Sequence, residues 1–110
     1  MTDCVFCKIV KNEIPCDKIY EDKDFLAFLD IRPLNKGHTL VIPKKHYRWT
    51  WDVENFGEYF EFAKKIEKSI EKALKPLRVL VLVFGVVIQH AHVHLVPRFI
   101  DDGHSSTITL

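Results

Sequence analysis

The chain has 110 residues, of which 47% are hydrophobic, 12% aromatic and 28% charged. This composition predicts a folded domain with a substantial core and excludes disordered, collagen-like and disulfide-scaffold classes. Sixteen basic and 15 acidic residues leave a formal net charge of +1, which offers no broad cationic field for a nucleic acid or an acidic membrane.

The first part of the chain predicts an ordered head over residues 1–16 and then three short strands. Residues 18–21 and 25–29 are joined by a charged turn, which is the pattern of a β-hairpin. Residues 38–42 are apolar and β-branched and stand between a glycine and a proline, so they predict a third strand. His38 opens this strand, and we expect its ring to be satisfied locally.

A long amphipathic helix is predicted from Asp52 to Lys75, because the hydrophobic period changes there from two to between three and four. Asp52 is the expected N-cap, and Pro76 ends the helix. The apolar positions with helical spacing are Val53, Phe56, Phe60, Ala63, Ile66, Ile70 and Ala73.

Two further strands are predicted after the helix. Residues 78–84 are almost continuously apolar, which predicts a strand buried on both faces, and residues 89–99 alternate strictly between the two faces. Together the elements predict an α+β fold in which a helix covers a mostly antiparallel sheet. Residues 100–110 form a short tail, so residues 1–110 are expected to make one domain.

The sequence also bears on the location of the protein. It begins without an apolar stretch of signal-peptide length, and its longest apolar run, residues 79–88, is far shorter than the roughly 20 residues that span a bilayer. Three cysteines are an odd number, which indicates reduced thiols or metal ligands rather than disulfides. We therefore expect a cytoplasmic protein with no membrane partner.

Three histidines occupy alternate positions of the last predicted strand, at His90, His92 and His94. Alternate side chains project from the same face of a strand, so the three imidazoles would form a row while the apolar residues between them enter the core. Shuffling this composition gives such a run only about 0.02 times per chain, and a merely solvent-facing strand seldom uses histidine three times. The row therefore predicts a functional site.

Two kinds of chemistry use such a row. A neutral imidazole can act as a nucleophile at phosphorus, while neighbouring imidazoles bind phosphate oxygens and move protons. Alternatively, three neutral imidazoles can bind one catalytic zinc ion whose water makes the attack. The histidine spacing alone leaves both open.

The segment from Gln89 to Arg98 resembles the signature of the histidine triad (HIT) family, His-x-His-x-His followed by two apolar residues. Further resemblances, in the family's order, lie at residues 3–9, 25–33 and 37–46. The likeness covers Cys4 to Arg98 and points to the branch with an N-terminal Cys-x-x-Cys pair. It implies a five-stranded antiparallel sheet with one long helix and a short N-terminal helix, commonly paired into a homodimer. It also implies hydrolysis or transfer at the α-phosphate of purine nucleoside phosphoramidates or dinucleoside polyphosphates.

The resemblance also implies roles for individual residues. His92 would be the nucleophile that forms a nucleotidyl-imidazole intermediate, and His94 would hold a phosphate oxygen. Phe28 and Ile31 match the apolar wall of the nucleoside pocket, and the Asp30 carboxylate could accept hydrogen bonds from both ribose hydroxyls. An aspartate at this position can also simply end a strand.

The Cys4-x-x-Cys7 pair has the spacing of a zinc knuckle, but a structural zinc site needs four ligands. In the resembling branch, the other two ligands match His46 and His90. Zn²⁺ would then be structural and would leave His92 and His94 free for chemistry. The alternative is that both thiols pack as small apolar groups, as we expect for Cys16.

The segment before the triad departs from the family pattern. The family carries polar residues there that bind the phosphate and the leaving group, whereas this shorter loop, residues 83–89, has Val86 and Val87. Gln89 is the remaining polar candidate for substrate binding. Preorganised donors contribute a few kcal/mol each to a transition state, so an alternative function is a catalytically weak nucleotide-binding or adaptor protein.

Overall fold

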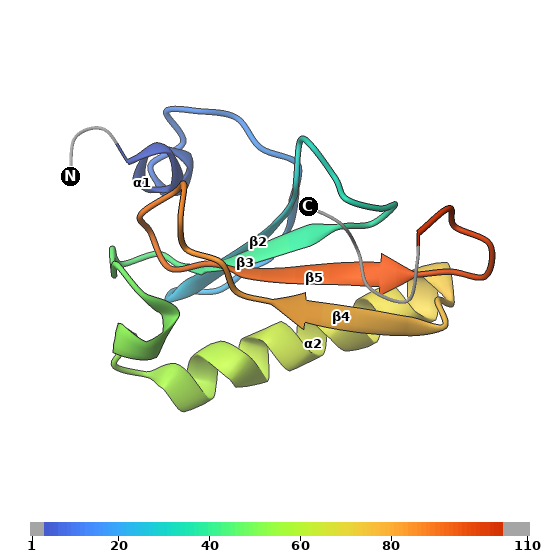
Figure 1. Ribbon diagram of the computed structural model, residues 1–110. Helices are drawn as coiled ribbons and strands as arrows, with labels where there is room; N and C mark the ends of the chain where they lie inside the picture. The colour runs from blue at the N-terminus through green and yellow to red at the C-terminus, as the bar shows by residue number, and fades with distance from the viewer. Residues whose placement is uncertain (1–3, 105–110) are drawn as a thin grey trace.

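The computed structural model describes residues 4–104. The predicted five-stranded antiparallel sheet with one long and one short helix is confirmed (Figure 1), and the strand order is β1-β2-β3-β5-β4. The elements in chain order are α1 (Val5–Val10), β1 (Lys18–Glu21), β2 (Phe25–Leu29), β3 (Thr39–Pro43), the 3-10 turn η1 (Thr50–Asp52), α2 (Phe56–Leu74), β4 (Arg78–Leu82) and β5 (Val93–Arg98).

The period-two pattern of the strands divides the core between the two faces of the sheet. One face packs against α2 through residues that include Phe25, Val41 and Leu95. The other face packs against α1, where Phe6 and Ile9 meet Phe28, Leu40 and Ile42. The strands β2 and β3 are almost wholly buried because both of their faces are covered. His90 and His92 lie on the α1 face, where the Phe6 ring packs against both of them.

The helix α2 begins three residues later than the sequence predicts. Asp52 ends η1 instead of capping the helix, and the N-cap is Asn55. Between them, Val53 is 3% exposed and has an extended backbone with ψ of 119°. Its side chain is drawn into the core, so the chain cannot continue as a helix there. At the other end, the helix stops at Leu74, as the following proline requires.

Two predictions about the last strands are wrong. The strand β4 is an edge strand with neighbours on one side, and Val81 is 53% exposed, so it is not buried on both faces. The strand β5 begins at Val93 rather than at residue 89. Before it, the Ala91 amide donates to the Tyr47 carbonyl at 2.7 Å, which takes this segment out of the sheet ladder.

No helix in the part of the chain that the structure describes is long and apolar enough to cross a membrane. The predicted tail begins with a turn in which Asp101 and Gly103 have positive φ angles of 56° and 85°. Residues 105–110 of the tail and residues 1–3 of the head lie outside the described residues.

Candidate active site

Four histidines from three segments meet on the α1 face of the sheet. His90 and His92 lie in the irregular segment before β5, His94 lies within β5 opposite Leu40, and His38 directly precedes β3. The alternation predicted for this segment persists, because the apolar residues between the histidines enter the core beneath α2. The prediction of one continuous strand is wrong for His90 and His92, since only His94 belongs to the ladder.

The hydrogen bonds of His92 fix its tautomer. Its Nδ1 lies 2.7 Å from the carbonyl oxygen of His90. A carbonyl oxygen only accepts, so Nδ1 carries the proton and Nε2 keeps its lone pair. Burial is the main cause that lowers the pKa of His92 below its ordinary value of 6.5. The ring therefore offers a neutral, unprotonated nitrogen.

The tautomer of His94 follows from a second pair of contacts. The Leu34 amide donates to Nδ1 of His38 at 2.9 Å, so the proton of a neutral His38 is on Nε2. That Nε2 lies 2.9 Å from Nδ1 of His94, which therefore accepts. The remaining nitrogen of His94, Nε2, carries a proton that it can donate. Burial is the largest cause that lowers the pKa of His94 to about 4; His92 and His38 also lower it, and Asp30 raises it.

Asp30 stands beside this histidine pair. Its Oδ2 lies 3.6 Å from Nε2 of His38, and its Oδ1 accepts the Arg32 amide at 2.8 Å. The negative charge raises the pKa of His38, but burial lowers it by more, so the net shift is downward. Asp30 thus both ends its strand in a local turn and presents one carboxylate oxygen toward the histidines.

An apolar cavity of about 210 Å³ opens beside the histidines. Of the residues predicted to bind substrate, Phe28, Asp30 and Ile31 line it, together with both predicted catalytic residues, His92 and His94. Further lining residues that the sequence left without a role include Phe6, Ile9, Leu40 and Ile88, and Cys16, expected to pack as a small apolar group, also lines the cavity. Gln89 is exposed and is not among the lining residues.

The four predicted metal ligands lie together at the other end of the histidine segment. One donor atom each from Cys4, Cys7, His46 and His90 can be chosen so that all four lie within 4.8 Å of one another. Nδ1 of His90 is 3.3 Å from Sγ of Cys4 and 3.5 Å from Sγ of Cys7. Nδ1 of His46 is 3.4 Å from the Cys7 sulfur.

This donor set fits a tetrahedral zinc ion. Zn–S bonds of about 2.3 Å and Zn–N bonds of about 2.05 Å give a tetrahedron whose S···N edges are about 3.5 Å. Nε2 of His90 lies 2.8 Å from the Pro43 carbonyl, so it carries the proton and Nδ1 has its lone pair toward the sulfurs. His90 is thus turned toward the cysteines and away from a site shared with His92 and His94.

A second group, Asp30, His38 and His94, has its donor atoms equally close together. The hydrogen bonds argue against a metal there. Nδ1 of His38 already accepts the Leu34 amide, so Nε2 carries a proton and has no lone pair for a metal ion. The group is a hydrogen-bonded cluster that orients His94.

The HIT domain family matches residues 11–101 of the chain. The chain belongs to the HIT family. It is 45% identical over 108 residues to an uncharacterized HIT-like protein of Methanocaldococcus jannaschii, covering 91% of the chain and 82% of that relative. It is 39% identical to an adenosine 5'-monophosphoramidase of Schizosaccharomyces pombe, covering 86% of the chain and 74% of that enzyme. The crystal structure of a Streptococcus mutans protein has a TM-score of 0.89 and 43% identity, covering 100% of this chain and 74% of that one.

The loop before the triad of this HIT domain has an apolar surface. Val86 and Val87 are 76% and 88% exposed. A hydrogen bond fixes the loop to the preceding segment, because Arg48 donates from Nη1 to the Gly85 carbonyl at 2.8 Å. Phe84 brings the loop to the site, with its ring centroid 5.0 Å from that of His94.

Sequence reasoning missed two contributors to this HIT site. His38 is satisfied locally at Nδ1, as expected, but its other nitrogen reaches His94 across 56 residues of sequence. Phe6 packs its ring at 5.2 Å from His92 and 5.6 Å from Phe28. His38 is two residues before Leu40, so the sequence could have placed both side chains on the same face. Its contact with His94 could not be predicted, because that contact depends on the register between β3 and β5.

Proposed function

We propose that this HIT protein is a nucleotide hydrolase or transferase that cleaves at the α-phosphate of purine nucleoside phosphoramidates or dinucleoside polyphosphates. One observation carries the proposal: beside an apolar cavity, His92 offers a lone pair at Nε2 and His94 offers a proton at Nε2. A nucleophile and a hydrogen-bond donor side by side suit a phosphoryl group, because attack and charge stabilisation are needed at the same atom. Membership of the HIT family supports a nucleotide hydrolase role in general.

The chemistry runs in two steps. Nε2 of His92 attacks the α-phosphorus, the N–P bond to His92 forms, and the bond from phosphorus to the leaving group breaks. The Nδ1–H bond to the His90 carbonyl stabilises the positive charge on the modified ring. The leaving amine takes up a proton from solvent as its bond to phosphorus breaks. Water then attacks the same phosphorus, the bond to His92 breaks and the water releases a proton to solvent, so that a phosphoramidate and water give the nucleotide and an amine. His94 donates to a phosphate oxygen in both steps.

The nucleoside is assigned to the cavity. Phe28 and Ile31 would contact the base and Asp30 the ribose hydroxyls, with Gln89 held as a further candidate for the phosphate or leaving group. The apolar lining, Phe6 and Leu40 included, supports a flat aromatic base more than a sugar or a peptide.

The experiment that tests this function measures AMP release from adenosine 5'-phosphoramidate by the wild-type protein and by His92→Asn. We expect turnover by the wild type and none by the variant, with AMP still binding to both by calorimetry. His94 is untouched in this variant, so retained AMP binding shows that the site remains folded. Substantial turnover by His92→Asn would refute the nucleophile assignment.

A catalytically weak nucleotide-binding protein is the second candidate, and the exposed Val86 and Val87 favour it. Hydrophobic side chains there give the leaving group no hydrogen-bond donors. Binding of AMP by the wild type without any turnover would support this candidate over the hydrolase.

We propose further that Cys4, Cys7, His46 and His90 bind a structural Zn²⁺ ion. The site would tie α1 to the segment that carries His92, and zinc would supply folding energy there rather than chemistry. All three cysteines are free thiols. Thiolate ligands persist in a reducing compartment, which supports the expected cytoplasmic location.

We also propose a homodimer formed through β4. This edge strand has unpaired backbone groups, and beside it lies a shallow groove lined by Phe60, Ala63, Val81 and Leu95 of the helix and sheet. An exposed apolar edge favours pairing with a second copy. The charges that flank the groove, Lys64 and Glu67, are opposite in sign and suit a symmetric contact.

A further inference from the structure

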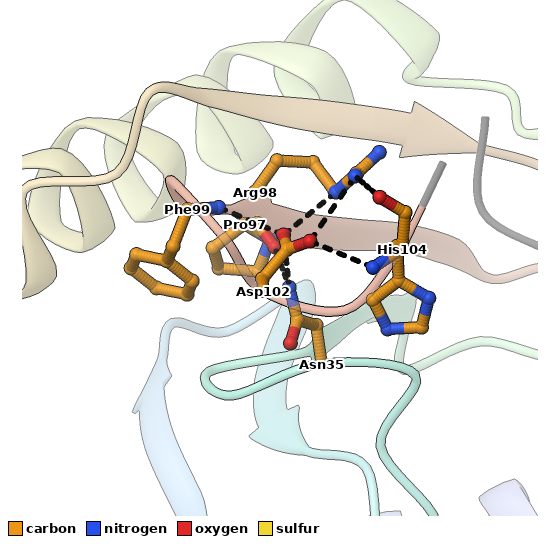
Figure 2. Close-up of polar contacts among 6 residues, drawn as sticks. All are labelled: Asn35, Pro97, Arg98, Phe99, Asp102 and His104. Atoms are coloured by element: carbon orange, nitrogen blue, oxygen red, sulfur yellow. Dashed lines mark hydrogen bonds and ion pairs between the residues drawn. The ribbon is translucent and has the colours of Figure 1, made fainter. Parts of the chain in front are cut away.

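A buried carboxylate at the end of β5 collects hydrogen bonds from three directions (Figure 2). The side chain of Asp102 is 6% exposed and pairs with Arg98, whose Nε lies 2.9 Å from Oδ2. The amides of Phe99 and His104 also donate to it, at 2.9 and 3.1 Å. The third direction is Asn35, whose Nδ2 donates at 3.0 Å from the turn between β2 and β3.

Asn35 is thereby tied to β5 at two points. The same Nδ2 that donates to Asp102 also donates to the Pro97 carbonyl at 2.9 Å. Asn35 and Pro97 are 62 residues apart in sequence, so these contacts fix the turn against the strand that carries His94. The turn is also packed closely at Gly37, which has a φ of 82°, because a Cβ there would collide with Leu74 and crowd Pro97.

The same turn sets the tautomer of His38. Asn35 accepts the His38 amide through its own carbonyl at 3.1 Å. Its neighbour Leu34 donates its amide to Nδ1 of His38, which leaves the His38 proton on Nε2, facing Nδ1 of His94. If the turn moved, His38 could adopt its other tautomer, and His94 would lose the partner that keeps its own proton on Nε2.

We propose that Asn35, anchored by Asp102, is a positioning residue that holds His94 in the tautomer with a proton on Nε2. Asn35 is not among the residues lining the cavity, so it acts through His38 and does not contact the nucleoside. The role of His94 as a phosphate donor rests on the proposed function, whereas the tautomer of its ring does not.

The test uses four forms of the full chain. Asn35→Asp places a second carboxylate against Asp102 with almost unchanged shape, and adding Asp102→Asn restores a donor and an acceptor between the two positions. Phe62→Leu is the control, since Phe62 belongs to the α2 core and is remote from the turn. The readouts are the ring ¹⁵N shifts of His38 and His94, kcat, KM and the fraction of folded protein.

We expect Asn35→Asp to lower kcat by about 10- to 100-fold, as the loss of supporting hydrogen bonds does at other sites. The affinity for AMP should stay within about threefold, and the ¹⁵N shifts should show a mixture of tautomers at His94. The double variant should recover part of the lost kcat and part of the wild-type His94 tautomer. Phe62→Leu should leave the tautomer unchanged and should lower kcat only in proportion to its unfolded fraction. Unchanged tautomers in Asn35→Asp would overturn the proposal. If the wild type hydrolyses nothing, the proposed function fails, but the ¹⁵N shifts still decide this inference.

Discussion

His92 and His94 lie with their ring centroids 5.0 Å apart, and their partners give the two Nε2 atoms opposite hydrogen-bonding character. The His90 carbonyl leaves His92 with a lone pair, and His38 leaves His94 with a proton. Two neighbouring imidazoles of one row thus differ at Nε2, because His92 is bonded to a backbone carbonyl and His94 to a fourth histidine. The proposed roles of these two nitrogen atoms can be tested separately by substitution.

The donor role of His94 predicts a graded response to substitution. His94→Gln keeps an N–H near the position of Nε2, whereas His94→Leu removes it at similar size. We expect kcat to fall by about tenfold in the first and by about 10²- to 10³-fold in the second, which matches the loss of one transition-state donor. Steady-state kinetics with adenosine 5'-phosphoramidate gives both values. Equal losses in the two variants would contradict the donor role.

The Cys4, Cys7, His46 and His90 cluster predicts one zinc ion per chain, measurable by elemental analysis. Because the proposed ion would join α1 to the segment before β5, removing it with a chelator should lower Tm by on the order of 10 °C. Cys7→Ala should abolish zinc binding and show the same lower Tm. Cys16→Ala is the matched control, since Cys16 lies outside the cluster, and it should keep the ion. A chelator that leaves Tm unchanged would rule out a structural ion.

The buried histidines predict that stability falls in mild acid. The pKa of His94 in the folded protein is about 4, against an ordinary value of 6.5, so the unfolded chain binds the proton more readily. His38 is shifted in the same direction by burial. Unfolding is therefore favoured as the pH falls from 6.5 toward 4, and the stability is fully present above 6.5.

Thermal unfolding in a series of buffers measures this effect. We expect Tm to fall by on the order of 5 °C between pH 6.5 and 4.5 beyond the change shown by His94→Gln, which has no titrating ring. Asp30, His38 and His92, the titrating groups that act on this ring, remain in both proteins, so the difference reports the loss of the His94 ring. Parallel Tm profiles for the two proteins would contradict the assigned shift.

The local pattern of the sequence predicts much of this fold. A hairpin pattern, a β-branched segment, an apolar run and an alternating segment predict the five strands, and Pro76 marks the end of α2. The two boundaries that the sequence predicts wrongly, the start of α2 and the start of β5, are determined by contacts between residues distant in sequence. Burial of Val53 delays the start of α2, and the Tyr47 carbonyl removes Ala91 from the ladder. Neither the burial of Val53 nor the bond from Ala91 to Tyr47 can be predicted from the residues adjacent in sequence.

The candidate site shows the same division. The spacing of the histidine triad and the spacing of Cys4 and Cys7 are local patterns that mark part of each cluster. The sequence assigns His46 and His90 to the metal cluster only through the resemblance to the family. The role of His38 depends instead on a register in which Leu40 lies opposite His94, and the anchoring of Asn35 depends on Asp102, 67 residues away. Antiparallel pairing determines these neighbours, and it follows from the whole core rather than from a motif.

The exposed edge of β4 predicts a dimer that one charge can break. Val81 is 53% exposed on this strand, and Val81→Lys places a cation in the proposed apolar contact. We expect the wild type to sediment as a dimer and the variant to raise the dissociation constant by at least about tenfold. Ile19→Lys is the control, because Ile19 is 40% exposed on β1 at the opposite edge, and this variant should remain a dimer. A monomeric wild type at micromolar concentration would rule out the dimer.

The apolar loop before the triad predicts a gain of activity. Val86 and Val87 are 76% and 88% exposed, so Val86→Ser and Val87→Asn should leave Tm nearly unchanged. A hydroxyl or amide there would add a donor for the phosphate or the leaving group, and we expect kcat to rise by about 3- to 10-fold. Leu77→Ser, at a 57% exposed site before β4, controls for a general effect of a more polar surface. If the rates do not change, the loop does not face the reacting group, and the slow step must be sought among the histidines themselves.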